Sequence, residues 1–365
     1  MNADIRVVVA MSGGVDSSVA AALLVEQGYD VVGMMMRLWS EETMNGRVHN
    51  RCCTPDQMAD ARRIADRLGF PFYVLDTKEV FRNTVVEFFI DQHRQGVTPN
   101  PCMECNRHIR FDYLQKNALA LDAEYLATGH YARIGRDAQG RYVLKKAVDE
   151  HKDQSYVLSV MGQEQLRHAL FPVGEYSKPE IRQIAERFGL PTASKKDSQD
   201  LCFVGDGNYR RFLAEHAPDI MVAGPIVRKT GEVIGQHEGL VNYTIGQRKG
   251  LGVMAAEPLY VIGMNPYRNA LIVGTKDELG QTELTANRVN WVSGEAPAEP
   301  FRAEVKIRYK AEPKPAWVEP QGVDRMAIRF DEPLRDITPG QAAVVYNGDL
   351  CLGGGIIERP PSTAR

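Results

Sequence analysis

The sequence predicts an α/β protein with a doubly wound parallel sheet, followed by two small β-rich domains, the last of which is a β-barrel. Apolar, strand-like runs alternate with helical patterns over the first 205 residues, which is typical of βαβ units. After Gly205 short strands are separated by glycines, and from about residue 280 the pattern is strand-like throughout. We expect domains at residues 1–205, 206–278 and 279–365.

The first domain is expected to contain four buried strands, because each run is short, apolar and rich in β-branched residues or methionine. These strands are predicted at residues 5–11, 31–36, 72–75 and 125–127. The helices between them have apolar residues at helical spacing. The first helix ends at Gly28, the second begins at Pro55 and ends at Gly69, and two more are expected at 80–90 and 111–121.

The second half predicts one helix, at 208–216, and then strands at 225–228, 231–235, 260–262 and 270–273. The clearest strand of the last domain is 301–312, where charged residues alternate with apolar ones at period two. Its solvent face is basic, an arrangement that is most often simply hydrated. The residues from Arg359 onward are expected to fray.

The composition excludes several classes of protein. With 44% hydrophobic and 25% charged residues, disorder, collagen and coiled coil are poor explanations. The net charge of −3 neither indicates nor excludes a nucleic-acid binder that keeps its basic residues on one face. No apolar run approaches the ~20 residues of a membrane span. Six cysteines are too few for a disulfide scaffold. We therefore expect a cytoplasmic protein without a membrane partner.

A glycine-rich loop lies between the first strand and the first helix. It reads Ser12-Gly13-Gly14-Val15-Asp16-Ser17, and its hydroxyls, close backbone N–H groups and helix N-terminus suit a phosphate or pyrophosphate. Neither the P-loop pattern nor G-x-G-x-x-G occurs here. Because no P-loop lysine is present, Mg²⁺ and nearby side chains must neutralise the phosphates, with Asp16 as an indirect metal contact.

The chain resembles the tRNA-specific 2-thiouridylases, a family with the ATP pyrophosphatase loop and an adenine nucleotide hydrolase-like fold. The resemblance runs essentially end to end, and many short motifs in one order carry it. They occupy residues 10–17, 33–36, 98–101, 127–131, 152–156, 195–198, 202–203, 246–250, 338–341 and 352–355. It implies an enzyme that adenylates the 2-carbonyl oxygen of the wobble uridine in tRNA and inserts sulfur there.

The resemblance also implies the binding residues. Those for ATP would be Ala10, Met11, Ser12, Gly13, Gly14, Val15, Asp16, Ser17, Met36 and Gly129. Those for tRNA would be Asn100, Pro101, Cys102, His130, Lys152, Asp153, Gln154, Arg308, Tyr309 and Gln341. For His130, a place inside the protein is an equally good interpretation. The target uridine must leave the anticodon loop stack to reach ATP, and Tyr309 is suited to stack on an unpaired base.

Thiolation through a persulfide needs two cysteines that meet in space. By resemblance Cys202 carries the persulfide and Cys105 is the nucleophile that resolves it. Many relatives have Asp where this chain has Cys102, and the change creates a C-x-x-C with Cys105. The alternative mechanism is therefore a [4Fe–4S] cluster held by Cys102, Cys105 and Cys202, with one open iron site.

The remaining cysteines carry weaker signals. Cys52 and Cys53 are expected to be two loop thiols at a helix start, with a low-pKa thiol that receives sulfur as the other possibility. Cys351 lies in an apolar strand and is expected to be buried.

Two other functional classes remain open. One is a different adenylating enzyme of the amidotransferase type, and the other is a sulfur or Fe–S carrier that binds RNA without chemistry. By resemblance the tRNA partners accept Lys, Glu or Gln. The upstream sulfur donor is either a cysteine desulfurase or a relay protein.

Overall fold

The computed structural model describes residues 2–42, 48–49, 53–195 and 201–360. Cys52 and the predicted motif residues Lys196, Asp197 and Ser198 lie outside this part of the chain. No helix in the described residues has the length and apolar character needed to cross a membrane.

The N-terminal domain is built on a five-stranded parallel sheet with the order β5-β2-β1-β6-β9. Its strands are β1 (Arg6–Ala10), β2 (Asp30–Arg37), β5 (Phe72–Asp76), β6 (Tyr125–Thr128) and β9 (Ala169–Leu170). The first four lie where the sequence predicted strands, but β5 is an edge strand and none of its residues is buried, contrary to the prediction. The α/β class is therefore confirmed, and β9 is an additional edge strand.

Helices cover both faces of this sheet. Val7 and Val9 of β1 pack in one apolar cluster with α1 (Val15–Glu26), α2 (Pro55–Leu68) and α9 (Lys178–Arg187). Val8, between them, packs in another cluster with residues of the segment 105–119. Since neighbouring side chains of a strand point to opposite faces, the sheet is buried on both sides at β1.

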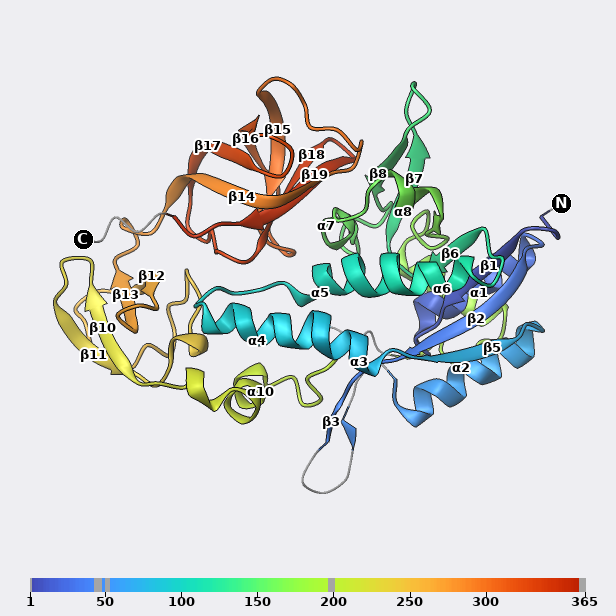
Figure 1. Ribbon diagram of the computed structural model, residues 1–365, viewed down its shortest axis with the longest axis horizontal. Coiled ribbons are helices and arrows are strands. Elements are labelled where there is room, and N and C mark those ends of the chain that lie inside the picture. The colour runs from blue at the N-terminus through green and yellow to red at the C-terminus, as the bar shows by residue number, and fades with distance from the viewer. Residues whose placement is uncertain (1, 43–47, 50–52, 196–200, 361–365) are drawn as a thin grey trace.

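A long, irregular helical layer carries the predicted cysteine motif. It runs through α3 (Lys78–Phe81), a π-helical turn (Arg82–Val86) and α4 (Glu87–Arg94), then α5 (Pro101–Glu104), a π-helical segment (Cys105–Leu114) and α6 (Gln115–Leu119). Pro101 stands at the first position of α5, where its missing N–H costs no hydrogen bond. Figure 1 shows α4 and α5 side by side below the barrel.

The central domain begins with α10 (Tyr209–His216), as predicted. It continues as a four-stranded sheet in the order β11-β10-β13-β12. The strands are β10 (Gly224–Arg228), β11 (Val233–His237), β12 (Tyr260–Asn265) and β13 (Ala270–Gly274). The strand predicted at 231–235 starts two residues later, because Gly231 adopts a left-handed φ of 91° in the preceding turn.

The C-terminal domain is a closed six-stranded barrel, since β14 pairs with both β17 and β19. Its strands are β14 (Gln281–Trp291), β15 (Phe301–Lys306), β16 (Lys314–Pro320), β17 (Met326–Leu334), β18 (Ala342–Asn347) and β19 (Leu350–Ile357). Closure leaves no open edge within the ring. The predicted barrel is confirmed.

The strand predicted at 301–312 is too long. β15 ends at Lys306, and the chain turns where Ala311 N donates to Arg308 O at 3.1 Å. β16 then pairs antiparallel with β15, so that Val305 lies opposite Lys314. The charge alternation continues past the strand end, but Arg308 bends inward instead of lying on the solvent face.

One hairpin joins the first domain to the barrel, and the sequence reading did not include it. It consists of β7 (Ala132–Arg136) and β8 (Tyr142–Lys146), and β8 pairs with β19 of the barrel. Figure 1 shows this hairpin standing beside the barrel. The short helices α7 (Ser155–Leu158) and α8 (Gln163–Arg167) follow it.

Candidate functional site

The glycine-rich loop forms a compact turn between β1 and α1. Ser17 Oγ accepts from Ser12 N at 3.2 Å and lies 3.2 Å from Ser12 Oγ. Gly13 has a φ of 69°, and a Cβ there would lie 2.3 Å from Gln57 O. Only glycine fits this position, so the loop presents backbone to any ligand above α1.

Asp16, in the first turn of α1, is held by two residues far along the chain. Lys178 Nζ donates to its carboxylate oxygens at 2.7 and 2.9 Å, and Tyr131 OH donates at 2.7 Å. Lys178 opens α9 and is largely buried. A cation therefore stands beside the loop without a P-loop motif, a feature that the sequence analysis missed.

A second lysine supports the loop from the other side. Lys195 Nζ donates to Gly13 O at 2.8 Å and to Asp60 of α2 at 2.8 Å. Lys178 and Lys195 thus place two ammonium groups beside the loop, each paired with a carboxylate, Asp16 and Asp60 respectively.

Gly129 follows β6 and lies directly against the loop. A Cβ at this residue would be 2.6 Å from Ser17 N and 2.7 Å from Asp16 C. Ala10 ends β1 opposite Met34, two residues before Met36 on β2. The predicted ATP residues therefore share the carboxyl edge of the sheet, where ligands of open α/β sheets bind.

We expect Gly129→Ala to weaken ATP binding about tenfold, since relieving such an overlap typically costs ~1–3 kcal/mol. Isothermal titration with a non-hydrolysable ATP analogue measures the effect. Gly135→Ala in β7 is the control, because its Cβ would meet Lys145 Cε at 3.4 Å, an ordinary contact. Equal affinities of the two variants would contradict the placement of ATP against Gly129.

The structure places Cys105 and Cys202 at the same apolar cluster. Cys105 is only 6% exposed and belongs to this cluster, which α4 and α10 also line, whereas Cys202 and Cys53 are partly buried and pack against it. Met36 borders the same cluster. All three cysteines have thiol side chains that are not part of a disulfide. Residues remote in sequence, one of them an ATP candidate, thus converge here.

Cys102 has different surroundings. It is exposed and lies near Tyr309 of the barrel. Tyr309 is 38% exposed and lies edge-on to Tyr156, with ring centroids 6.1 Å apart. Burial comes first among the causes that raise the pKa of Tyr309. Lys306 Nζ lies 5.7 and 5.9 Å from these two rings.

Several predicted tRNA residues are held inside the protein. His130 is 7% exposed, and its imidazole contacts Thr128 Oγ1 at 2.6 Å and Arg110 at 3.2 Å. Burial, assisted by Arg110, lowers the pKa of His130 well below its ordinary value. His130 is therefore a neutral interior histidine, the alternative that the sequence left open.

The tRNA candidates Asp153 and Gln154 in the turn at 152–154 also form hydrogen bonds within the protein. Asp153 is buried and accepts from Ala147 N and from both Ser155 N and Ser155 Oγ. Gln154 Oε1 accepts from Tyr131 N at 2.9 Å, while Lys152 is half-buried. The side chains of Asp153 and Gln154 therefore hold this turn together from inside. Of its three residues, Lys152 is the one with a positive charge.

The predicted tRNA residues of the barrel lie close to the segment that precedes α5, and Gln341 forms hydrogen bonds with it. Gln341 Nε2 donates to Thr98 O at 2.9 Å and Pro99 O at 3.2 Å. Arg308 donates to Thr338 Oγ1 and to Ile245 O of the central domain. Asn100 is half-buried and hydrogen-bonds to Tyr156. Pro101 is buried. The barrel candidates thus surround the segment that leads to Cys102.

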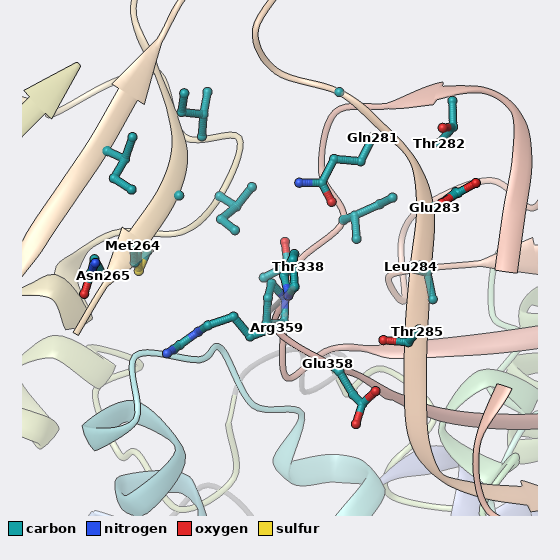
Figure 2. A pocket seen from close by; sticks show the side chains of 18 of the residues that line it. Met264, Asn265, Gln281, Thr282, Glu283, Leu284, Thr285, Thr338, Glu358 and Arg359 are labelled. Atoms are coloured by element: carbon teal, nitrogen blue, oxygen red, sulfur yellow. The ribbon is translucent and has the colours of Figure 1, made fainter. Parts of the chain in front are cut away.

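A large hollow of about 1510 Å³ lies between the central domain and the barrel. Figure 2 shows its wall at Gln281–Thr285 and the side chain of Arg359, which donates to Gly96 O at 3.1 Å. None of the glycine-rich loop residues and none of the cysteines in the described part of the chain line it. It adjoins the Thr98–Thr338 region but does not belong to the ATP site.

One group of potential metal ligands occurs among the described residues, formed by Glu41, Glu215 and His216. Arg211 donates to both carboxylate oxygens of Glu41, at 2.7 and 3.0 Å. Since Arg211 already neutralises this buried carboxylate, we interpret the group as an ion-pair network.

Three family models match the chain in succession. The tRNA methyl transferase HUP domain matches residues 5–206, the tRNA methyl transferase PRC-barrel domain residues 210–275, and the aminomethyltransferase beta-barrel domain residues 281–357.

Similar proteins cover nearly the whole chain. The tRNA-specific 2-thiouridylase MnmA of Clostridioides difficile is 46% identical over 355 residues, which are 97% of this chain and 98% of that protein. The MnmA of Symbiobacterium thermophilum is 49% identical over 359 residues, 97% of this chain and 92% of that protein.

Solved structures show more distant likeness. The U34-tRNA thiolase NcsA from Methanococcus maripaludis with its [4Fe–4S] cluster is 18% identical, with a TM-score of 0.35, over 59% of this chain and 67% of that one. A 4-thiouridine synthetase in complex with RNA and ATP is 17% identical, with a TM-score of 0.34, over 59% and 51%.

Proposed function

The chain belongs to the family of the tRNA-specific 2-thiouridylases, and from this premise we infer that it is an ATP-dependent enzyme that replaces the 2-oxygen of the wobble uridine in tRNA by sulfur. One observation supports this most directly. Cys105 belongs to an apolar cluster that Cys202 and Met36 also border. Methyl transfer, which the family-model description mentions, would need neither two converging thiols nor a pyrophosphate loop.

The first step is adenylation. ATP, taken as its Mg²⁺ complex, lies on the glycine-rich loop with its phosphates near Lys178 and Lys195. The uridine O2 attacks the α-phosphorus, the bond to the bridging oxygen breaks, and pyrophosphate leaves. Two ammonium groups beside the loop stabilise the charge that develops on the leaving group.

The second step transfers sulfur. The terminal sulfur of a Cys202 persulfide attacks C2 of the adenylated uridine, and AMP departs. The Cys105 thiolate then attacks Cys202 Sγ and breaks the S–S bond, so the electron pair remains on the sulfur of the thiocarbonyl. The product is 2-thiouridine and a Cys105–Cys202 disulfide, which an external dithiol must reduce before the next turnover.

The function is tested with purified protein, MgATP, an unmodified tRNA and a persulfide donor. We expect 2-thiouridine by mass spectrometry, with one AMP formed per thiouridine. AMP release that does not depend on tRNA would favour an amidating synthetase. A visible absorption band without ATP turnover would favour a carrier protein.

The three thiols of the alternative Fe–S mechanism lie in unlike surroundings. Cys102 is exposed next to Tyr309, whereas Cys105 and Cys202 border the apolar cluster. We therefore derive no step through a cluster.

The Cys102→Ala variant separates the two mechanisms. For the relay we expect the thiolation rate to fall by less than about tenfold, equivalent to 1.4 kcal/mol of lost contact with the tRNA. Iron and sulfide analysis of both proteins, purified without oxygen, accompanies the rate measurement. Complete loss of thiolation together with loss of bound iron would overturn the relay.

A further inference from the structure

The barrel holds the cysteine-bearing helix at two points. The first lies before α5, where Thr98 N donates to Pro339 O at 3.0 Å and Gln341 binds two carbonyls. Gly340 has a φ of 89°, and a Cβ there would lie 2.8 Å from Thr98 O. The approach of the two backbones at this point leaves no room for a side chain.

The second point is an ion pair at the residue immediately before Cys105. Glu104 closes α5, and its side chain is only 3% exposed. Its Oε2 accepts from Arg288 of β14 at 2.9 Å and lies 3.3 Å from His108 Nε2. The Arg288 guanidinium also lies 5.8 Å from the Phe88 ring of α4. Arg288 thus contacts α4 and the last residue of α5, directly before Cys105.

The barrel distorts its own strand to present Arg288. Arg288 has a φ of 50°, a left-handed conformation that is unfavourable for a residue with a long side chain. The register of β14 against β19 shifts between Asn287 and Asn290. Val289 N donates to Asp324 O instead, at 2.9 Å. A bulge of this kind redirects a side chain out of the regular pleat.

The surroundings of Glu104 indicate that its buried carboxylate needs the ion pair with Arg288. Glu104 Oε1 and Arg107 Nε are buried and lack a hydrogen-bond partner among the described residues. Burial alone would raise the pKa of Glu104, but hydrogen bonds from His108 and Arg288 outweigh it and lower the pKa. The carboxylate is therefore charged, and Arg288 is the barrel's contribution to its neutralisation.

We propose that Arg288 is a positioning residue for sulfur transfer, because its pair with Glu104 fixes the helix that carries Cys105 to the barrel that carries the tRNA candidates. This rests on the proposed function of the same site. A nucleophile must be held within a fraction of an ångström of its target, and a misplacement of about 1 Å costs as much as 100-fold in rate. Adenylation, which occurs at the glycine-rich loop, does not depend on this contact.

The test variant is Glu104→Leu combined with Arg288→Met. Replacing both partners by apolar side chains of similar size leaves neither member of this pair as a buried unpaired charge. In a single turnover we expect pyrophosphate and AMP formation to stay within about twofold of wild type, while the thiouridine released per AMP at early times falls at least about tenfold. Arg288→Lys, which keeps the charge, should restore part of this ratio.

Alkylation of Cys105 provides a second readout that needs neither ATP nor tRNA. Since Cys105 is almost buried, loosening its helix should increase its alkylation rate at least about fivefold by local opening. The control is Arg302→Met with Asp331→Leu, which removes an exposed barrel pair at 2.7 Å that does not touch α5. This control should leave both readouts unchanged.

Wild-type ratios and alkylation in the double variant would overturn the proposal. Equal losses of adenylation and thiolation would do the same, because they would indicate a general effect on folding. If the wild-type protein makes no thiouridine, the proposed function fails, whereas the alkylation rates still report whether the pair holds Cys105.

Discussion

The Cys202→Ser and Cys105→Ser variants should each lose thiolation by more than about 10³-fold, as expected when a nucleophile is removed. Both should still release pyrophosphate, because the glycine-rich loop and Lys178 are unchanged, but only Cys105→Ser should go on to release AMP, since AMP departs when the persulfide attacks C2. In Cys202→Ser no persulfide forms. In Cys105→Ser the persulfide attacks C2, but the tRNA then stays attached to Cys202 through an unresolved disulfide. Mass spectrometry of the protein after the reaction distinguishes these two states by the mass of the attached tRNA, which a reducing agent removes.

The control for both variants is Cys351→Ala. Cys351 is buried in β19, where burial raises the pKa of its thiol, so it is an inert core residue. Cys351→Ala should thiolate normally at a temperature at which it is folded. Normal thiolation by Cys202→Ser would remove the persulfide carrier from the mechanism and leave sulfur delivery to another group.

The second large effect is expected at Lys178. Lys178→Met should lower the rate of tRNA-dependent AMP formation about 10²- to 10³-fold, the usual result of removing one preorganised charge beside a transition state. The loss has two parts: the ammonium near the leaving pyrophosphate disappears, and the Asp16 carboxylate that it neutralised then repels the phosphates. Quenched-flow measurement of pyrophosphate release with wild-type and variant protein gives the rate.

Arg187→Met, on the same helix, is the matched control. Arg187 forms an exposed ion pair with Glu26 at 3.0 Å, and such pairs contribute little to stability. Its rate should match wild type. If Lys178→Met also retained the wild-type rate at saturating ATP, Lys178 would have only a structural role in holding α9 to α1.

Local signals were sufficient to predict most of the first domain. The β-branched runs at β1 and β2, Pro55 and Gly69 at the ends of α2, and the glycine-rich loop all depend on residues close together in sequence. For example, Gly69 adopts a φ of 78° as a helix C-cap. Elements defined by such neighbours can be read without knowing the fold.

What the sequence did not predict depends on contacts between distant segments. Lys178 and Lys195 reach the glycine-rich loop from 162 and 182 residues away, a proximity that only the order of the strands determines. The inward turn of Arg308 depends on Thr338 and Ile245 from two other segments. The sequence therefore did not reveal which lysines lie beside the loop, although it indicated that nearby side chains must help to neutralise the phosphates.

The pairing of β8 with β19 has a consequence for how the protein is made. Leu144 lies opposite Cys351 in that pairing, so one side of β8 stays without its neighbour until almost the entire polypeptide has left the ribosome. A bare strand edge invites pairing with other chains. The nascent first domain should accordingly aggregate when synthesis stops before β19. Pairing of β19 with β8 is then the folding step that completes the first domain.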